Sequence, residues 1–122
     1  GEAVTLLFKP RHVAPIMGEA EPGKTETRRL WDQWRVKVGG TYYASTHLYK
    51  KEARFARILV NRRWIEPLIA ISPESALNEG YLTKEDFLAA FASINGPVPL
   101  KTEVHVVRFT VVEDLRGRKW DG

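Results

Sequence analysis

The stretch Gly23-Lys24-Thr25-Glu26-Thr27-Arg28-Arg29-Leu30 decides how the rest of the chain is interpreted. It follows a loop containing Gly and Pro, and it combines three cations, two hydroxyl groups and one carboxylate. As a strand, it places Thr25, Thr27 and Arg29 on one face, and Glu26 and Arg28 on the other. Lys24 lies where the loop meets the strand. Because such a face is poorly suited to a core, the stretch predicts a polar cleft for an anion or a nucleobase.

The same stretch completes a match to the phosphate-loop pattern G-x-x-x-x-G-K-[ST], from Gly18 to Thr25. A working phosphate loop needs a buried strand before it and a helix after it. Here a helical turn broken by proline precedes the loop, and a β-type segment follows it. Glu19 and Glu21 would also repel phosphate, and Pro22 has no amide proton to donate. We therefore interpret the match as coincidence.

The order of elements favours an α+β fold. We expect strands over 4–8, 24–30, 41–49, 53–64 and 104–112, with a helical turn over 11–17. Ser72-Pro73 and Thr83 have the chemistry of helix starts, and the two helices should end near Gly80 and at Asn95-Gly96. Without regular βαβ alternation, this order predicts a small mixed β-barrel with two inserted helices. Residues 2–115 form the predicted domain, and 116–122 form a polar tail that we expect to fray.

Length and composition limit the class of protein. The chain has 122 residues, 43 % of them hydrophobic and 28 % charged, which is typical of one globular domain. It has no cysteine, which excludes disulfides and thiolate sites and fits a cytoplasmic location. We find no apolar run of membrane-spanning length and no signal-like segment at the N-terminus. The three histidines lack metal-ligand spacing, so we predict no metal and no cofactor.

Charge is distributed unevenly along the chain. The net charge is +4, but residues 1–63 contain 13 Lys/Arg against six Asp/Glu, whereas residues 64–115 contain three against eight. A polarised surface would follow, with a basic side able to meet phosphates. The other interpretation is a solvated surface rich in ion pairs, as in thermophilic proteins.

Several of these segments together resemble an ASCH domain. They are Leu7-Phe8-Lys9-Pro10, the Gly23–Arg29 stretch, the Val38-Gly39 turn, Ala76-x-x-Glu79-Gly80 and the closing Val-Val-x-Phe strand. The resemblance covers residues 4 to 114. It implies a PUA-like β-barrel that binds RNA, while one branch member has been described as a ribonuclease. The loop before Lys24 is longer and more acidic than is usual in the family. The two-helix insertion around Glu79 resembles archaeal and thermophile members more than the compact amidohydrolases of the family.

One branch of that family, the small bacterial N4-acetylcytidine amidohydrolases, is similar at the same positions. Its catalytic Lys, Thr and Glu correspond to Lys24, Thr27 and Glu79, and Arg29 matches the arginine two residues after the threonine. A threonine hydroxyl needs a base, and a lysine kept neutral by burial and nearby cations could accept its proton. Glu79 would orient the lysine or act as acid–base. The residues that we assign to substrate or RNA binding are Lys9, Thr25, Arg28, Arg29, Trp31 and Tyr43.

Three functions remain open from the sequence. The first is binding of RNA or a modified nucleoside in a basic cleft, with no membrane partner. The second is hydrolysis of an acylated cytidine or of RNA, and the third is a protein-interaction module. Lys24 and Glu79 could also form an ordinary ion pair, with Thr25 and Thr27 serving only as β-formers.

Overall fold

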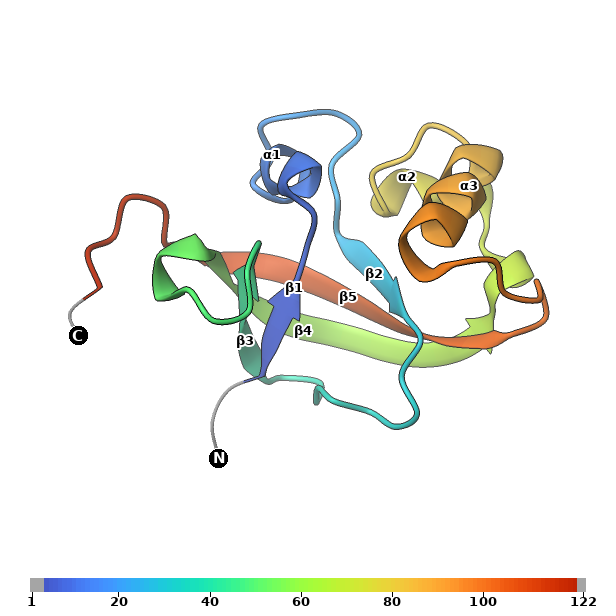
Figure 1. Cartoon of the computed structure of the whole chain (residues 1–122), viewed down its shortest axis with the longest axis horizontal. Helices are drawn as coiled ribbons and strands as arrows, with labels where there is room; N and C mark the ends of the chain where they lie inside the picture. The colour runs from blue at the N-terminus through green and yellow to red at the C-terminus, as the bar shows by residue number, and fades with distance from the viewer. Residues whose placement is uncertain (1–3, 121–122) are drawn as a thin grey trace.

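A five-stranded mixed sheet carries the fold (Figure 1). The computed structural model describes residues 4–120. The sheet has the order β1-β3-β4-β5-β2; β1 pairs parallel with β3, and the other neighbours are antiparallel. The strands are β1 (Thr5–Leu7), β2 (Glu26–Arg29), β3 (Thr41–Ser45), β4 (Arg54–Pro67) and β5 (Glu103–Asp114). The helices are η1 (Pro10–His12), α1 (Val13–Ile16), η2 (Lys51–Ala53), η3 (Leu68–Ala70), α2 (Pro73–Asn78) and α3 (Lys84–Asn95).

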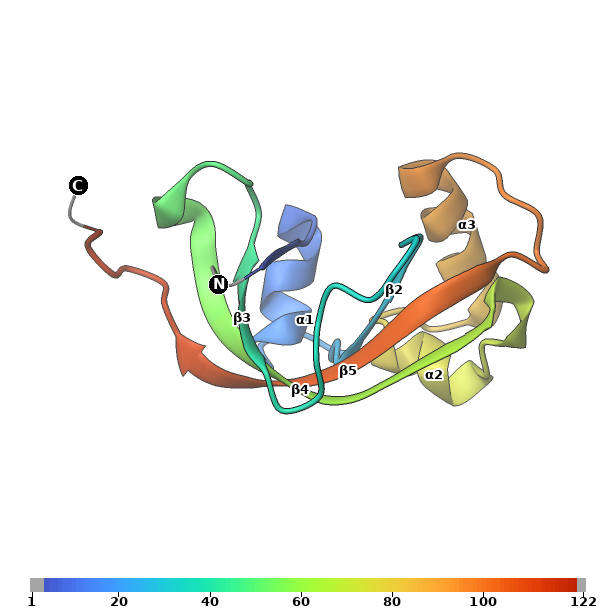
Figure 2. The same ribbon diagram turned by 90° about the horizontal axis from the view of Figure 1, so that it is seen from below.

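The long β4–β5 pair divides the interior into two clusters. Val107 and Phe109 of β5 pack with β1, α1, β3 and β4, whereas Val104 and Val106 pack with η3, α2 and α3. Val104 and Val106 stand at even positions and Val107 and Phe109 at odd positions, so the two pairs of side chains leave opposite faces of β5. Figure 2 shows the bend of the sheet, with α1 over one part and α3 over another. One strand therefore contributes side chains to both hydrophobic clusters.

Both predicted helix starts are confirmed. The Ser72 hydroxyl accepts a hydrogen bond from the Ser75 amide at 3.0 Å, and Pro73 occupies the first turn of α2. The Thr83 hydroxyl accepts from the Asp86 amide at 3.0 Å and begins α3. These bonds satisfy amides that a helix leaves without partners, which is why the local sequence determines where α2 and α3 begin.

The α+β class is confirmed, but the sheet does not close into a barrel. Strands β1 and β2 are its two edges, and they are only three and four residues long. Across the opening between them, Arg29 of β2 donates from Nη2 to the Leu7 carbonyl of β1 at 2.7 Å. A side chain thus makes the connection that a backbone ladder would make in a closed barrel.

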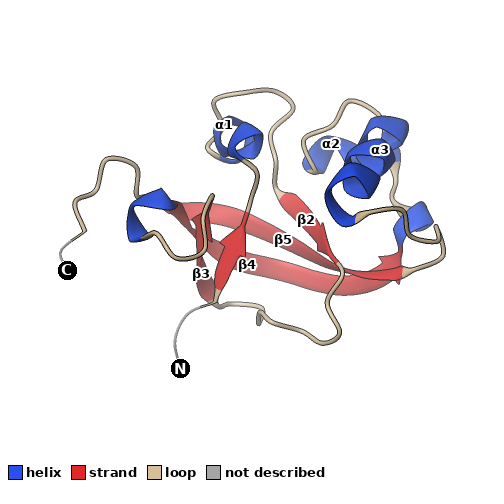
Figure 3. Ribbon diagram, in the orientation of Figure 1, coloured by secondary structure: helices blue, strands red, loops and turns tan. Residues whose placement is uncertain are grey.

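Several predicted boundaries differ from the structure. The strand expected over 24–30 begins at Glu26, the run expected over 41–49 ends at Ser45, and the strand expected over 53–64 continues to Pro67. Figure 3 shows the loop between β2 and β3 without helix or strand.

The tail also differs from its prediction over residues 116–120. Arg116 donates to both carboxylate oxygens of Glu19, at 2.7 and 2.8 Å, and Trp120 meets Tyr43 edge to face. Within residues 4–120, the structure contains no helix that is long and apolar enough to cross a membrane.

Candidate functional site

A cavity of about 390 Å³ lies where the two edges of the sheet face the helices. Its walls come from the end of β1, from η1, from β2 and from α3. Aromatic and aliphatic side chains form part of the wall, and three basic residues of the Gly23–Leu30 stretch line it as well. The lining residues include Phe8, Lys9, His12, Lys24, Thr27, Arg28, Arg29, Thr46, Glu79, Tyr81, Phe87 and Phe91.

Lys24 and Glu79 form a buried ion pair beside the cavity. Lys24 Nζ lies 2.7 Å from Glu79 Oε1 and also donates to the Glu79 carbonyl at 3.0 Å. Both side chains are 3 % exposed. Burial, together with Arg29 and Arg28, lowers the pKa of Lys24, and the attraction of Glu79 opposes the shift without cancelling it. Lys24 is therefore closer to neutrality than a lysine in water.

Arg28 connects this pair to two further carboxylates. It donates to Glu79 Oε2 at 3.0 Å, to Glu26 Oε1 at 3.1 Å and to Glu66 Oε2 at 3.2 Å. Burial alone would lower the pKa of Arg28, but the carboxylates, Glu79 first, raise it. Arg28 is therefore a permanent cation whose charge these neighbours already balance.

Glu26 is fully buried and is held by three donors. Besides Arg28, Asn78 donates to its Oε2 at 3.0 Å, and Arg108 of β5 donates to the same oxygen at 2.7 Å. Burial favours the protonated acid, but the hydrogen bonds from Arg108, Asn78 and Arg28 outweigh it and lower the pKa of Glu26. Glu26 therefore stays ionised and holds Arg28 in place.

Arg29 is held differently from the other two cations. Its Nε donates to Thr27 Oγ1 at 2.9 Å, and its Cζ lies 4.9 Å from the centre of the Phe8 ring. Within residues 4–120 it forms no ion pair with a carboxylate. Burial lowers the pKa of Arg29 to about 10, with Glu79 opposing the shift. At neutral pH this guanidinium is thus a charged group that protein carboxylates do not balance by direct contact.

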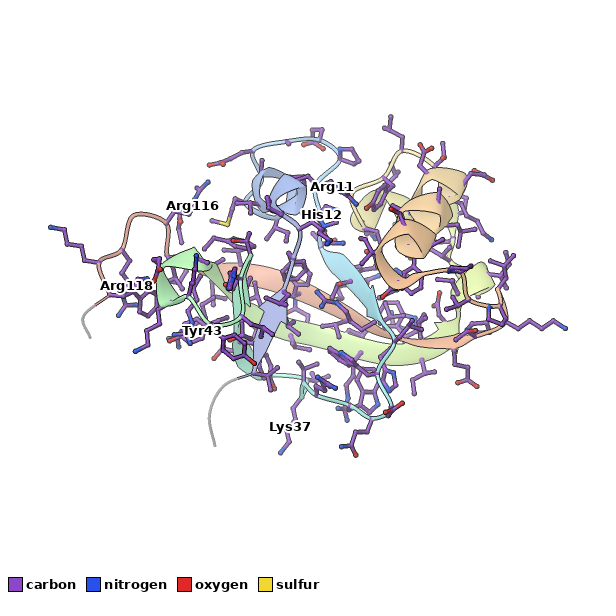
Figure 4. The ribbon with its side chains drawn as sticks, viewed as in Figure 1. Arg11, His12, Lys37, Tyr43, Arg116 and Arg118 are labelled. Atoms are coloured by element: carbon purple, nitrogen blue, oxygen red, sulfur yellow. The ribbon has the colours of Figure 1, made fainter. Side chains whose placement is uncertain are left out.

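His12 and Tyr81 meet at the cavity wall. Their Nε2 and hydroxyl atoms are 3.1 Å apart, and Tyr81 also packs edge to face on Phe87. Burial, then Lys24, Arg11 and Arg29, lower the pKa of His12 to about 3, so the imidazole is neutral at physiological pH. Figure 4 shows Arg11 and His12 between α1 and the α2–α3 pair.

The structure brings together most, but not all, of the predicted site residues. Lys24, Thr27 and Glu79 line the cavity, and so do Lys9, Arg28 and Arg29. Thr25 is exposed and is not part of the lining. Trp31 packs with Trp34 and His105, while Tyr43 stacks with Arg54 and Trp120, both outside the lining.

The interpretation of the phosphate-loop match as coincidence is confirmed. Strand β2, not a helix, follows the loop. The Lys24 amide donates to the Pro15 carbonyl at 3.1 Å, and the Thr25 amide donates to the Asn78 carbonyl at 2.7 Å. Amides engaged in this way are not free to bind a phosphate.

Four polar residues of the site were not predicted from the sequence: Glu26, Arg108, His12 and Tyr81. The alternation placed Glu26 and Arg28 on one face, and Arg108 interrupted an apolar strand. Both were signals of a buried charged cluster, because arginine and glutamate inside a sheet need partners. The contact between His12 and Tyr81 joins residues 69 positions apart, and no local pattern announces it.

Two solved structures share this arrangement of strands and helices. Protein EF3133 from Enterococcus faecalis V583, described under the family model DUF984, has a TM-score of 0.67 at 16 % identity, over 97 % of this chain and 85 % of that one. An ASCH domain from Lactobacillus crispatus JV V101 has a TM-score of 0.61 at 12 % identity, over 89 % of this chain and 79 % of that one. This chain has the ASCH fold.

The ASCH fold confirms the structural part of the resemblance. No protein-family model matches the sequence, and a search of curated proteins finds no match either. Identities of 12 and 16 % support the fold alone. The similarity to N4-acetylcytidine amidohydrolases therefore stays a prediction for this ASCH fold, to be argued from the residues in the cavity.

Proposed function

We propose that the cavity binds a nucleobase, presented either by RNA or by a modified nucleoside. The observation that carries the proposal is the pairing of an aromatic wall, Phe87 and Phe91, with a cationic one, Arg29, in one cavity. The volume of about 390 Å³ lies within the roughly 300–1,000 Å³ that small-molecule sites occupy. Flat rings that stack and a few fixed polar groups that orient are what base recognition requires.

The charges in the cavity support a ligand with carbonyl or phosphate oxygens. Glu79 already occupies Lys24 and Arg28, and Glu26 and Glu66 also contact Arg28. Arg29 is left with hydroxyl and carbonyl acceptors only. An incoming oxygen would gain a charged hydrogen bond from it without first separating an ion pair. The ASCH fold adds a fold-level analogy in favour of RNA.

Binding can be tested by calorimetric titration of cytidine, N4-acetylcytidine and a short single-stranded RNA. We expect saturable binding, weakened at least tenfold in Arg29→Gln, because the free cation is lost. Arg62→Gln is the matched control, since it removes an exposed arginine that does not line the cavity. An equal effect of the two substitutions, or no binding of any of the three ligands, would contradict the proposal.

A second candidate function, hydrolysis of an N4-acyl amide, is favoured by the contact between Arg29 and Thr27. A cationic donor 2.9 Å from Thr27 Oγ1 stabilises negative charge that develops on that oxygen. Thr27 Oγ1 would attack the acyl carbon while its proton passes to a neutral Lys24. The C–N bond would then break as Lys24 returns the proton to the departing N4 nitrogen. Water would release the acyl group from Thr27 as a free acid.

Thr27→Val separates hydrolysis from binding, because valine keeps the shape of threonine and lacks the hydroxyl. With N4-acetylcytidine as substrate, we expect cytidine release by the wild type and none by Thr27→Val, with nucleoside affinity changed less than threefold. If folded wild-type protein binds the nucleoside and releases no cytidine, the cavity binds without reacting. Release that persists in Thr27→Val would exclude this hydroxyl as the nucleophile.

A further inference from the structure

A second basic surface lies outside the cavity, where β3, the start of β4 and the C-terminal tail meet. Arg54 Cζ lies 4.1 Å from the ring centre of Tyr43 and 5.3 Å from that of Trp120. Arg57 lies 5.4 Å from the Tyr43 ring, and Arg118 lies 4.5 Å from the Trp120 ring. The two rings meet edge to face at 6.0 Å. We call these five residues the arginine–aromatic cluster.

The rings of the cluster hold the guanidinium groups of Arg54 and Arg118 without neutralising them. Within residues 4–120, Arg54 and Arg118 form no ion pair, and Arg57 Nε lies 3.4 Å from Glu113 Oε1 without a hydrogen bond. An arginine stacked on a ring keeps its charge and its planar set of N–H donors. Phosphate oxygens are the acceptors that match such donors best, often in pairs.

The cluster is also continuous with the rim of the cavity. Thr46 lines the cavity, and its amide donates to the Ala53 carbonyl at 3.2 Å, directly before Arg54. The turn between them carries Lys50 and Lys51, both exposed. In Figure 4, Tyr43 and Arg118 lie towards the C-terminal tail and away from His12. A strand that leaves the cavity over this turn would pass from one basic surface to the next.

We propose that the arginine–aromatic cluster binds the phosphodiester backbone of single-stranded RNA whose base occupies the cavity. The position of that base rests on the function proposed above, whereas the phosphate contacts rest on the cluster alone. Tyr43 then takes part in RNA binding by holding Arg54, not by lining the cavity. The preferred ligand is an oligonucleotide, since a free nucleoside does not reach the cluster.

The test is the affinity of a fluorescent single-stranded RNA, followed by anisotropy at several salt concentrations. We compare the double variant Arg54→Ala/Arg118→Ala with Arg35→Ala/Arg62→Ala, which removes two exposed arginines outside the cluster. The first variant should bind RNA roughly tenfold more weakly, and its log–log salt slope should fall by about 1.4, at about 0.7 for each lost phosphate contact. The control variant should change the affinity less than threefold.

Titration of the nucleoside alone separates this inference from the proposed function. Its affinity should be the same in wild type and in Arg54→Ala/Arg118→Ala. If no nucleoside binds but RNA binding still depends on Arg54 and Arg118, base binding in the cavity is contradicted and phosphate binding by the cluster is supported. Equal RNA affinity in both double variants would overturn the proposal that the arginine–aromatic cluster binds RNA.

Arg54→Lys/Arg118→Lys guards against loss of folding in the alanine variant, since it preserves the charge and removes only the planar guanidinium. We expect several-fold weaker RNA binding, and unchanged affinity would show that the stacked guanidinium groups are not the ligands.

Discussion

Lys24 Nζ donates to two oxygens of Glu79, the carbonyl at 3.0 Å and Oε1 at 2.7 Å, across 55 residues of sequence. The backbones of the two residues also form an isolated antiparallel bridge. This double connection joins the loop before β2 to Glu79, the residue that follows α2. It fixes the ammonium group by main chain and side chain together. Lys24 is thus positioned by the fold and not by a flexible four-carbon chain.

Glu79→Gln should lower the free energy of unfolding by about 3 kcal/mol, because it removes the charge that balances two buried cations. The amide keeps the shape of the carboxylate, so packing is not the cause. Urea unfolding measures the change as a lower midpoint at constant slope. Glu113→Gln, which affects only the exposed contact with Arg57, is the control and should change stability by less than about 1 kcal/mol. Equal effects in the two variants would mean that the buried pair is not needed for stability.

Gly80→Ala should destabilise the protein by about 1–2 kcal/mol, since Gly80 has φ +95° and a side chain strains this conformation. The strain would fall next to Glu79, so nucleoside affinity should fall as well. Gly39→Ala is the matched variant: φ is +86° there, no atom lies within 4 Å of the added methyl group, and the residue does not line the cavity. We expect a similar loss of stability with unchanged affinity, and calorimetry measures both. A loss of affinity in both variants would show that the effect is not local.

For the proposed hydrolysis of N4-acetylcytidine, the pH profile should show whether Lys24 acts as the base. Only the neutral amine accepts a proton, so kcat/KM should rise with pH through the pKa of Lys24, which lies below 10.5. Arg29 lowers that pKa, so Arg29→Gln should move the rising limb to higher pH. Arg62→Gln should leave the limb in place. If the rising limb does not move in Arg29→Gln, the limb reports the pKa of a group other than Lys24.

Local sequence was sufficient to predict those elements that depend only on interactions between neighbouring residues. The caps at Ser72 and Thr83 depend on a hydroxyl and an amide three residues apart, and both are observed. The alternation within Gly23–Leu30 placed Thr27 and Arg29 on one face, and both line the cavity. Thr25 does not, because its side chain is exposed and lies outside the lining.

What sequence could not supply was the order of the strands. Tyr43 is an aromatic residue of the type that stacks on bases, but β4 and β5 separate its strand, β3, from β2. The expected division into a basic and an acidic half is likewise not kept, because the fold pairs residues of one half with residues of the other. Lys24 and Arg28, counted as basic surface, are buried against Glu79 and Glu66 from the acidic half. Charge along a chain predicts surface charge only where these side chains stay in solvent.

His12 should make the protein sensitive to acid. Its pKa is about 3 in the folded chain against 6.5 when unfolded, so below pH 6.5 the unfolded state binds a proton that the folded state does not. Stability therefore falls as the pH drops from 6.5 towards 3. Urea midpoints at pH 7, 5.5 and 4.5 should fall less steeply in His12→Gln than in the wild type. Tyr81→Phe should retain the steep fall, because burial, and not the tyrosine hydroxyl, is the main cause of the shift. Parallel pH profiles for His12→Gln and wild type would show that this imidazole is not held neutral by the fold.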